Sequence, residues 1–201
     1  TFDRNEVRWV CLEDLGHLYS GLTGKSKADF ADGNAPYITY MNVFANLAAD
    51  VSPSTMVKVR STESQTPIAY GDVLFTASSE SREEVGMASA VTSPPPQPTY
   101  LNSFCFGFRP HSYDELNPEF AKHLFRSRTM REQIVKAANG VTRINISKAA
   151  FRRIAVPLPE PKDQARIAQI LDGLDALVSD LSSGLPAEIE ARRQQYAYYR
   201  D

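Results

Sequence analysis

Residues 163–200 read DQARIAQILDGLDALVSDLSSGLPAEIEARRQQYAYYR, and this stretch decides how the chain is organised. Its apolar residues recur at alternating spacings of four and three positions, which is the a/d pattern of a heptad repeat. As one helix it would extend about 57 Å at roughly 1.5 Å per residue, longer than a small domain is wide. We call its apolar positions the helical seam; they are Ile167, Leu171, Leu174, Val178, Leu181 and Leu185.

Two interpretations of the helical seam stay open. It either pairs with a second helix as in a coiled coil, or packs back on its own domain as an amphipathic lid. The sequence Gly184-Leu185-Pro186 also leaves open whether the helix is continuous there.

Length and composition predict one globular domain before this helix. The chain has 201 residues, 42% of them hydrophobic, which is enough for one substantial core. We place the domain at residues 1–158 and the helical arm at 159–201. No apolar run approaches the roughly 18 residues that cross a bilayer. Cys11 and Cys105 have neither CxxC spacing nor a secretory signal ahead of them, which favours free thiols in the reducing cytoplasm.

Positive charge is concentrated in one block of the chain. Residues 109–153 hold ten Lys or Arg against four Asp or Glu, whereas the whole chain has a net charge of −2. Such a block indicates a surface that faces a polyanion, although a solvated helical face gives the same composition.

The loop over residues 20–26 ends in Gly24-Lys25-Ser26, like a phosphate-binding loop for nucleotides. That motif needs a glycine five positions before Gly24, where this chain has Tyr19, so nucleotide binding is excluded. Lys25 and Ser26 remain suited to contacts with a nucleic-acid backbone.

Most of the first 110 residues have strand propensity. Residues 37–43 and 73–76 are predicted strands, and Tyr37 and Asn42 on the first are candidates for contacts with base edges. Phe104, Phe106 and Phe108 alternate with smaller residues, which predicts one aromatic strand face for the core or for base stacking.

The basic block begins with two predicted helices. Asn117-Pro118-Glu119 has the N-cap, N1 and first-turn residues of a helix start, and Thr129 to Glu132 reads as a capping box, with Asn139-Gly140 ending the second helix. Four basic residues are expected to be exposed around the junction and to hold phosphates: Arg126, Arg128, Arg131 and Lys136.

A strand is predicted next, over residues 141–148. Ile144 and Ile146 would point into the core and Arg143 and Asn145 the other way. Because Arg can bond guanine and Asn can bond adenine bidentately, we expect base contacts here, with Thr142 beside them and Lys148 on a phosphate. An ordinary half-exposed edge strand remains the alternative.

No catalytic motif emerges from the sequence. The histidines and cysteines lack metal-ligand spacing, and the Gly-x-Ser-x-Gly motif is absent. We therefore expect no catalytic residues, no metal and no bound cofactor.

Five segments, in this order, give the chain a strong resemblance to the DNA specificity subunit of type I restriction–modification systems. They are GDVLF at 71–75, NGVTRINIS at 139–147, VPLP at 156–159, GLPAEI at 184–189 and RRQQYAYYRD at 192–201.

The resemblance implies an α+β target-recognition domain with a twisted, mostly antiparallel sheet and short helices, followed by a long coiled-coil-type helix. It implies that such a domain reads half of a split double-stranded DNA target. Methyltransferase subunits with S-adenosylmethionine, and a restriction or motor subunit, would supply the catalysis.

The chain departs from that pattern because it carries one recognition domain and one helix rather than two of each. It is expected to be either a piece of a longer subunit or a half-subunit that self-associates through the helical seam. Two rival classes remain: a protein-interaction module without a DNA role, and a nuclease or methyltransferase with unrecognised motifs.

Overall fold

The computed structural model describes the backbone of residues 7–200 and the side chains of residues 7–179 and 195. The chain divides into two compact units, Thr1–Ala165 and Arg166–Asp201. The first turn of the long C-terminal helix therefore belongs to the first unit, seven residues beyond the boundary that the sequence analysis placed after residue 158.

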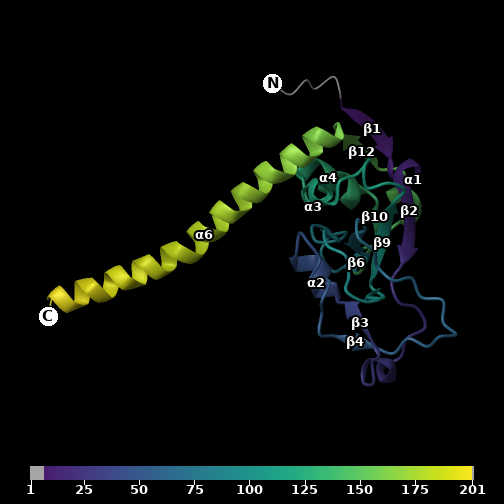
Figure 1. Ribbon diagram of the computed structural model, residues 1–201, viewed down its shortest axis with the longest axis horizontal. Helices are drawn as coiled ribbons and strands as arrows, with labels where there is room; N and C mark the ends of the chain where they lie inside the picture. The colour runs from purple at the N-terminus through teal and green to yellow at the C-terminus, as the bar shows by residue number, and fades with distance from the viewer. Residues whose placement is uncertain (1–6, 201) are drawn as a thin grey trace. The chain divides into compact units, whose positions relative to one another are not determined.

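The elements of both units are labelled in Figure 1. The strands are β1 (Arg8–Cys11), β2 (Gly16–Ser20), β3 (Ala35–Ile38), β4 (Met56–Val57), β5 (Val73–Thr76), β6 (Ser78–Ser79), β7 (Ala88–Ala90), β8 (Tyr100–Leu101), β9 (Cys105–Pro110), β10 (Ala138–Asn139), β11 (Ile144–Ile146) and β12 (Ala155–Leu158). The helices are α1 (Leu12–Leu15), η2 (Lys27–Phe30), α2 (Tyr40–Ala45), α3 (Pro118–Leu124), α4 (Arg128–Lys136), α5 (Lys148–Arg152) and α6 (Pro161–Arg200).

A four-stranded antiparallel sheet in the order β2-β9-β5-β7 forms the centre of the first unit. All four residues of β5 are buried, because α2 and α3 pack against this strand. Phe75 on β5 contacts Phe106, Phe125 and Phe151 with ring centroids 4.9–5.3 Å apart. This aromatic cluster joins the sheet to the helical segments that follow it in sequence.

Three smaller sheets complete the unit: β1-β12, β10-β11-β6 and β4-β3-β8. Among the named strands of the described chain, the only parallel pair is β3 with β8. The prediction of a mixed, mostly antiparallel fold with short helices is confirmed, but the strands are divided among four sheets rather than joined in one.

Two predicted strands are partly helical. The strand predicted over residues 37–43 ends at Ile38, and Thr39 then caps α2 by accepting a hydrogen bond from the Asn42 amide at 3.1 Å. In the same way Ser147 caps α5, so the strand predicted over residues 141–148 ends at Ile146. In both cases a hydroxyl at the N-cap satisfies an amide that a strand would have paired with its neighbour.

The two helices of the basic block are confirmed, with one change of cap. The Asn117 side chain accepts from the Glu119 amide at 2.8 Å, and Pro118 occupies the first helical position. The second helix is capped by Ser127, not by Thr129. Asn139 lies in β10 and Gly140 follows it, so this pair opens a hairpin instead of ending α4.

The start of α6 is fixed to the first unit by Gln164, which is 1% exposed. Its side-chain amide donates to the carbonyls of Glu115 at 2.9 Å and Pro159 at 3.0 Å, and its oxygen accepts from the Asn117 amide at 2.9 Å. The bounds of α6 contain Pro186.

Within the second unit, Leu174 and Val178 of the helical seam are 52% and 61% exposed. Ile170 and Leu177, which the sequence analysis did not include, are exposed beside them. The side chains of Leu181 and Leu185 lie outside the described residues, and pairing through the seam stays a prediction.

Candidate nucleic-acid interface

The hairpin of β10 and β11 presents the polar residues that the sequence singled out. β11 lies between β10 and β6, and Ile144 is buried against Val85 and Ala138. Asn145 is exposed on the same strand, so the predicted alternation is confirmed. Gly140 has a φ of 119°, and a Cβ there would lie 2.2 Å from the Arg143 carbonyl oxygen. The tip of the hairpin therefore requires glycine at this position.

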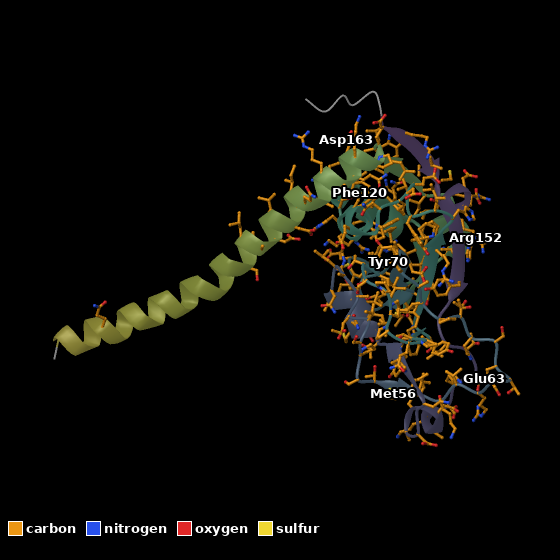
Figure 2. The ribbon with its side chains drawn as sticks, viewed as in Figure 1. Met56, Glu63, Tyr70, Phe120, Arg152 and Asp163 are labelled. Atoms are coloured by element: carbon orange, nitrogen blue, oxygen red, sulfur yellow. The ribbon has the colours of Figure 1, made fainter. Side chains whose placement is uncertain are left out.

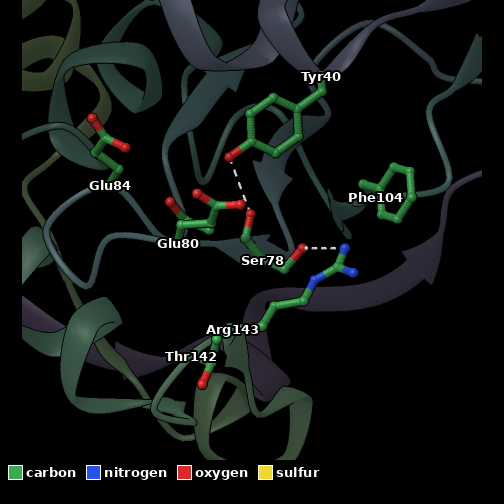
Figure 3. A pocket seen from close by; sticks show the side chains of 8 residues that line it. Tyr40, Ser78, Glu80, Glu84, Phe104, Thr142 and Arg143 are labelled. Carbon is green, nitrogen blue, oxygen red and sulfur yellow. Dashed lines mark hydrogen bonds between the residues drawn. The ribbon is translucent and has the colours of Figure 1, made fainter.

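Arg143 stands at the edge of a cavity of about 530 Å³, which we call the Arg143 recess (Figure 3). Its guanidinium donates to the Ser78 hydroxyl at 3.2 Å and lies 5.2 Å from the centroid of the Phe104 ring. The Tyr40 hydroxyl donates to the Ser78 carbonyl at 3.0 Å. The recess is also lined by Thr142, Glu80 and Glu84.

Lys148 begins α5, two residues after β11. Its ammonium donates to the Ser20 hydroxyl at 2.8 Å and lies 5.9 Å from the Phe106 ring centroid. Partial burial, followed by repulsion from Arg152, lowers the pKa of Lys148 from its ordinary value. Arg152 is exposed and is labelled in Figure 2; the sequence analysis did not choose it, although it lies in the basic block. A second positive charge therefore acts near Lys148.

Arg128 and Lys136 are exposed on α4, as predicted. The Arg128 side chain is 92% exposed and pairs with Glu132, one helical turn later, at 2.9 Å. An exposed pair of this kind is weak, so it leaves Arg128 able to exchange its partner for a phosphate.

Arg126 and Arg131 are structural residues rather than exposed cations, which corrects the prediction. Arg126 donates to the carbonyls of Ala88 at 2.6 Å, Phe44 at 2.8 Å, Val43 at 3.0 Å and Asn46 at 3.1 Å. Burial lowers the pKa of both arginines, and that of Arg126 is lowered further by the charge of Arg131.

Arg131 holds the segment that precedes β7. Its guanidinium donates to the carbonyls of Gly86 at 2.6 Å, Val85 at 2.7 Å and Glu83 at 2.8 Å. The two guanidinium groups thus fasten the α3–α4 region to β7 and to the end of α2.

Lys25 and Ser26 are likewise occupied within the fold. The Lys25 side chain is 3% exposed, pairs with Glu63 and donates to the Lys58 carbonyl at 2.5 Å. Ser26 forms a capping box with Asp29, donating its hydroxyl to the carboxylate at 2.7 Å. Lys25 is therefore a buried structural lysine that is not available to a phosphate, whereas Ser26 is exposed and its phosphate contact stays a prediction.

Asn42 and Tyr37 do not join the polar hairpin either. The Asn42 amide donates to the Asp50 carbonyl at 2.9 Å, and its oxygen accepts from the Asp50 amide at 3.0 Å. Tyr37 is half-buried on β3 and packs edge-on against Phe30 at 5.3 Å. The contacts of Asn42 occupy its side-chain oxygen and one of its amide hydrogens within the fold, whereas Tyr37 keeps partial exposure. Base contacts by these two residues stay a prediction.

The structure thus brings together Thr142, Arg143 and Asn145, with Lys148 following β11. It adds four residues that the sequence analysis passed over, Tyr40, Ser78, Glu80 and Glu84, together with Phe104. The sequence analysis placed Phe104 on an aromatic strand face for the core or for base stacking. Phe106 and Phe108 are buried in the core, but Phe104 precedes β9 and is 52% exposed. The exposure of Phe104 and its contact with Arg143 depend on the fold, so the sequence carried no signal that would have placed them together.

Among the described residues, no group of three or more His, Cys, Asp or Glu is placed to hold a metal ion. In the same part of the chain, no helix has both the length and the apolar character needed to span a membrane.

Comparison with known sequences gives one family across nearly the whole chain. The family described as "Type I restriction modification DNA specificity domain" matches residues 5–191. The specificity subunit of the type I restriction enzyme EcoR124I/EcoR124II from Escherichia coli is 29% identical over all of this chain and 49% of its own length. That of StySPI from Salmonella potsdam is 32% identical over 66% of this chain and 27% of its own length. The chain spans about half the length, or less, of these relatives.

Solved structures agree with the fold. The HsdS subunit from Thermoanaerobacter tengcongensis superposes with a TM-score of 0.62 at 19% identity, over 92% of this chain and 41% of that one. A chain from a study of "complex assembly and conformational transition of the type I R-M system" has a TM-score of 0.66 at 20% identity, over 98% and 45%.

Proposed function

Because the chain belongs to the family of type I restriction modification DNA specificity domains, we propose that its first unit binds double-stranded DNA and reads one half of a bipartite target. The observation that carries the proposal is the exposed part of the hairpin, where Thr142 and Arg143 precede β11 and Asn145 lies within it. Arg and Asn are the side chains that bond guanine and adenine edges in pairs of hydrogen bonds.

Phosphate contacts would come from the neighbouring cations. Lys148 and Arg152 follow the hairpin directly, and Arg128 and Lys136 are exposed on α4. These residues would position the domain on the duplex and make its affinity fall with salt, while the hairpin supplies the sequence preference.

The second unit would pair with another helix of its kind. The exposed apolar residues of α6 support this, because Ile170, Leu174, Leu177 and Val178 are each more than half exposed. Since the chain spans about half the length of its relatives, the partner helix would come from a second copy or from the rest of a longer chain. Paired helices would set the distance between two half-sites.

Catalysis would belong to other subunits, and this chain would be a non-catalytic reader. Methyltransferase subunits carrying S-adenosylmethionine, and a restriction or motor subunit, are the proposed partners. Support comes from the names of the relatives, which are specificity subunits of type I restriction enzymes. A protein that reads genomic DNA would work in the cytoplasm of a prokaryotic cell.

The test is selection of bound duplexes from a randomised pool at low and moderate salt. The proposal expects enrichment of one short sequence that survives the higher salt. Binding without enrichment, or no binding at either salt, contradicts it, and the second outcome favours a module that binds only protein.

A further inference from the structure

The electrostatics of the Arg143 recess distinguish between two kinds of DNA contact. Arg143 brings one positive charge, whereas Glu80 and Glu84 bring two carboxylates. A phosphate would be repelled by that pair. A base edge is uncharged and carries both hydrogen-bond donors and acceptors, so it matches a recess that offers a guanidinium as donor and two carboxylates as acceptors beside several hydroxyl groups.

The strand register places one of these carboxylates across from Arg143. In the β11–β6 pair, Ile144 lies opposite Ser79 and Asn145 opposite Ser78. Continuing this antiparallel register by one residue sets Arg143 opposite Glu80. Within the described chain Arg143 forms its hydrogen bond with Ser78 and no ion pair with Glu80, so both groups keep their capacity for a ligand.

Phe104 and Ser78 fix the guanidinium before any ligand arrives. The Phe104 ring contacts the face of the Arg143 guanidinium in a cation–π interaction. The Ser78 hydroxyl accepts a hydrogen bond from the edge of the same group. Ser78 is itself buried and held through its backbone carbonyl by the Tyr40 hydroxyl (Figure 3). A guanidinium held by its face and one edge presents its remaining N–H groups in a fixed direction.

We propose that the Arg143 recess reads one G·C base pair in the major groove, with Arg143 donating to guanine O6 and N7 and Glu80 accepting from the N4 amine of the paired cytosine. These atoms lie on a single base-pair edge, and Arg with guanine and Glu with cytosine are the matching side chains. Phe104 is a positioning residue that keeps the guanidinium plane aimed at the base. This inference rests on the proposed function and names the base pair that the hairpin recognises.

The experiment uses the full 201-residue chain and the duplex that it selects from a randomised pool. Replacing the critical guanine by 7-deazaguanine removes the N7 acceptor, and we expect wild-type binding to weaken roughly 5- to 150-fold. Inosine keeps O6 and N7 and should bind like guanine. Arg143→Lys keeps the charge but not the bidentate fork, so it should lose the guanine preference while keeping the salt dependence of binding.

Matched variants separate the roles of the other side chains. Phe104→Leu should reduce the preference for guanine and Phe104→Tyr should restore it. Glu80→Ala should weaken binding to the selected duplex, whereas Glu83→Ala, an exposed neighbour that does not line the recess, should not.

The outcomes distinguish this inference from the proposed function. A wild-type chain that selects no sequence overturns both. A clear selected sequence that Arg143→Lys leaves unchanged, or a wild-type chain indifferent to 7-deazaguanine at every guanine, overturns only the assignment to the recess. If Glu83→Ala and Glu80→Ala weaken binding equally, the carboxylate acts through net charge and the cytosine contact is wrong.

Discussion

Asp72 and Arg109 form a bidentate ion pair at the end of the central sheet. Arg109 Nε donates to Asp72 Oδ1 at 2.8 Å, and Nη2 donates to Oδ2 at 2.7 Å. Asp72 is fully buried and also accepts from the Tyr19 hydroxyl at 2.7 Å and the Ala69 amide at 2.8 Å. The strong hydrogen bonds to Asp72 raise the pKa of Arg109, and burial, followed by the Asp72 charge, raises that of Tyr19. The cluster therefore joins β2, β9 and the start of β5.

Asp72→Ala is expected to destabilise the first unit by about 3 kcal/mol, because it leaves Arg109 and Tyr19 without their acceptor. The value is at the lower end for a broken buried pair, since the Arg109 side chain is 26% exposed. Urea unfolding measures the loss. Glu132→Ala is the control, because its exposed pair with Arg128 should change the free energy of unfolding by less than about 1 kcal/mol. Equal losses for the two variants would contradict the role of burial.

Acid is expected to weaken the loop region around Glu63, which is labelled in Figure 2. The hydrogen bond from Lys25 lowers the pKa of Glu63 from 4.5 to about 2, and the hydrogen bond from the Ser26 amide lowers that of Asp29 from 3.8 to about 2. Both pKa values are depressed on folding, so their stabilisation is complete above about pH 4.5 and is lost as the pH falls toward 2.

The measurement is the melting temperature between pH 6 and pH 2. Glu63→Gln should lower the melting temperature at pH 6 and flatten its decline below about pH 4.5. Exposed Glu13→Gln is the control and should keep the wild-type slope. An unchanged slope in Glu63→Gln would show that this carboxylate does not contribute to acid unfolding.

Substitutions of Arg131 and Lys148 are expected to affect different properties, namely stability for Arg131 and DNA binding for Lys148. Arg131→Ala removes three hydrogen bonds to backbone carbonyls and should lower the free energy of unfolding by about 2 kcal/mol, with little change in the salt dependence of DNA binding. Lys148→Ala should leave stability nearly unchanged and reduce the slope of log K against log salt by about 1. Titrations at several salt concentrations and urea unfolding of both variants check this. If Arg131→Ala instead reduced the salt dependence and left stability unchanged, Arg131 would be a DNA contact and not a structural residue.

A charge in the helical seam is expected to prevent self-association. Leu174→Glu and Val178→Glu place carboxylates at seam positions and should shift the chain toward the monomer in light scattering, if the partner helix comes from a second copy. Ala176→Glu is the matched control, because position 176 is exposed and lies opposite the seam in the heptad. Loss of association in all three variants would show an effect of charge rather than of the seam.

Local chemistry predicted the parts of the fold that depend on neighbouring residues. Asn117-Pro118 starts α3, and the alternation around Ile144 separates buried from exposed side chains, because both patterns act within a few positions. Thr39 and Ser147 are also local caps, but their hydroxyl signals compete with strand propensity, which is why two predicted strands were too long.

The candidate site was less predictable, because whether a basic side chain is exposed or bonded within the fold depends on residues that are distant in the sequence. Arg126 and Arg131 belong to the same basic block as Arg143, yet their acceptors lie about 40 to 80 positions earlier, on α2, on β7 and in the segment before β7. Lys25 finds Glu63 in the same way. Sequence alone counts these charges but does not show which carbonyls and carboxylates the fold will bring to them.

In the β10–β11 hairpin, the residues that determine the backbone shape are different from the exposed polar residues. Gly140 shapes its turn, and Ile144 anchors one strand in a small apolar cluster, while Thr142, Arg143 and Asn145 contribute nothing to that cluster. In the proposed function, substitutions at these three positions would change the DNA sequence that is bound while the apolar cluster under the hairpin stays intact. A recognition domain built in this way can change its binding specificity without changing its fold.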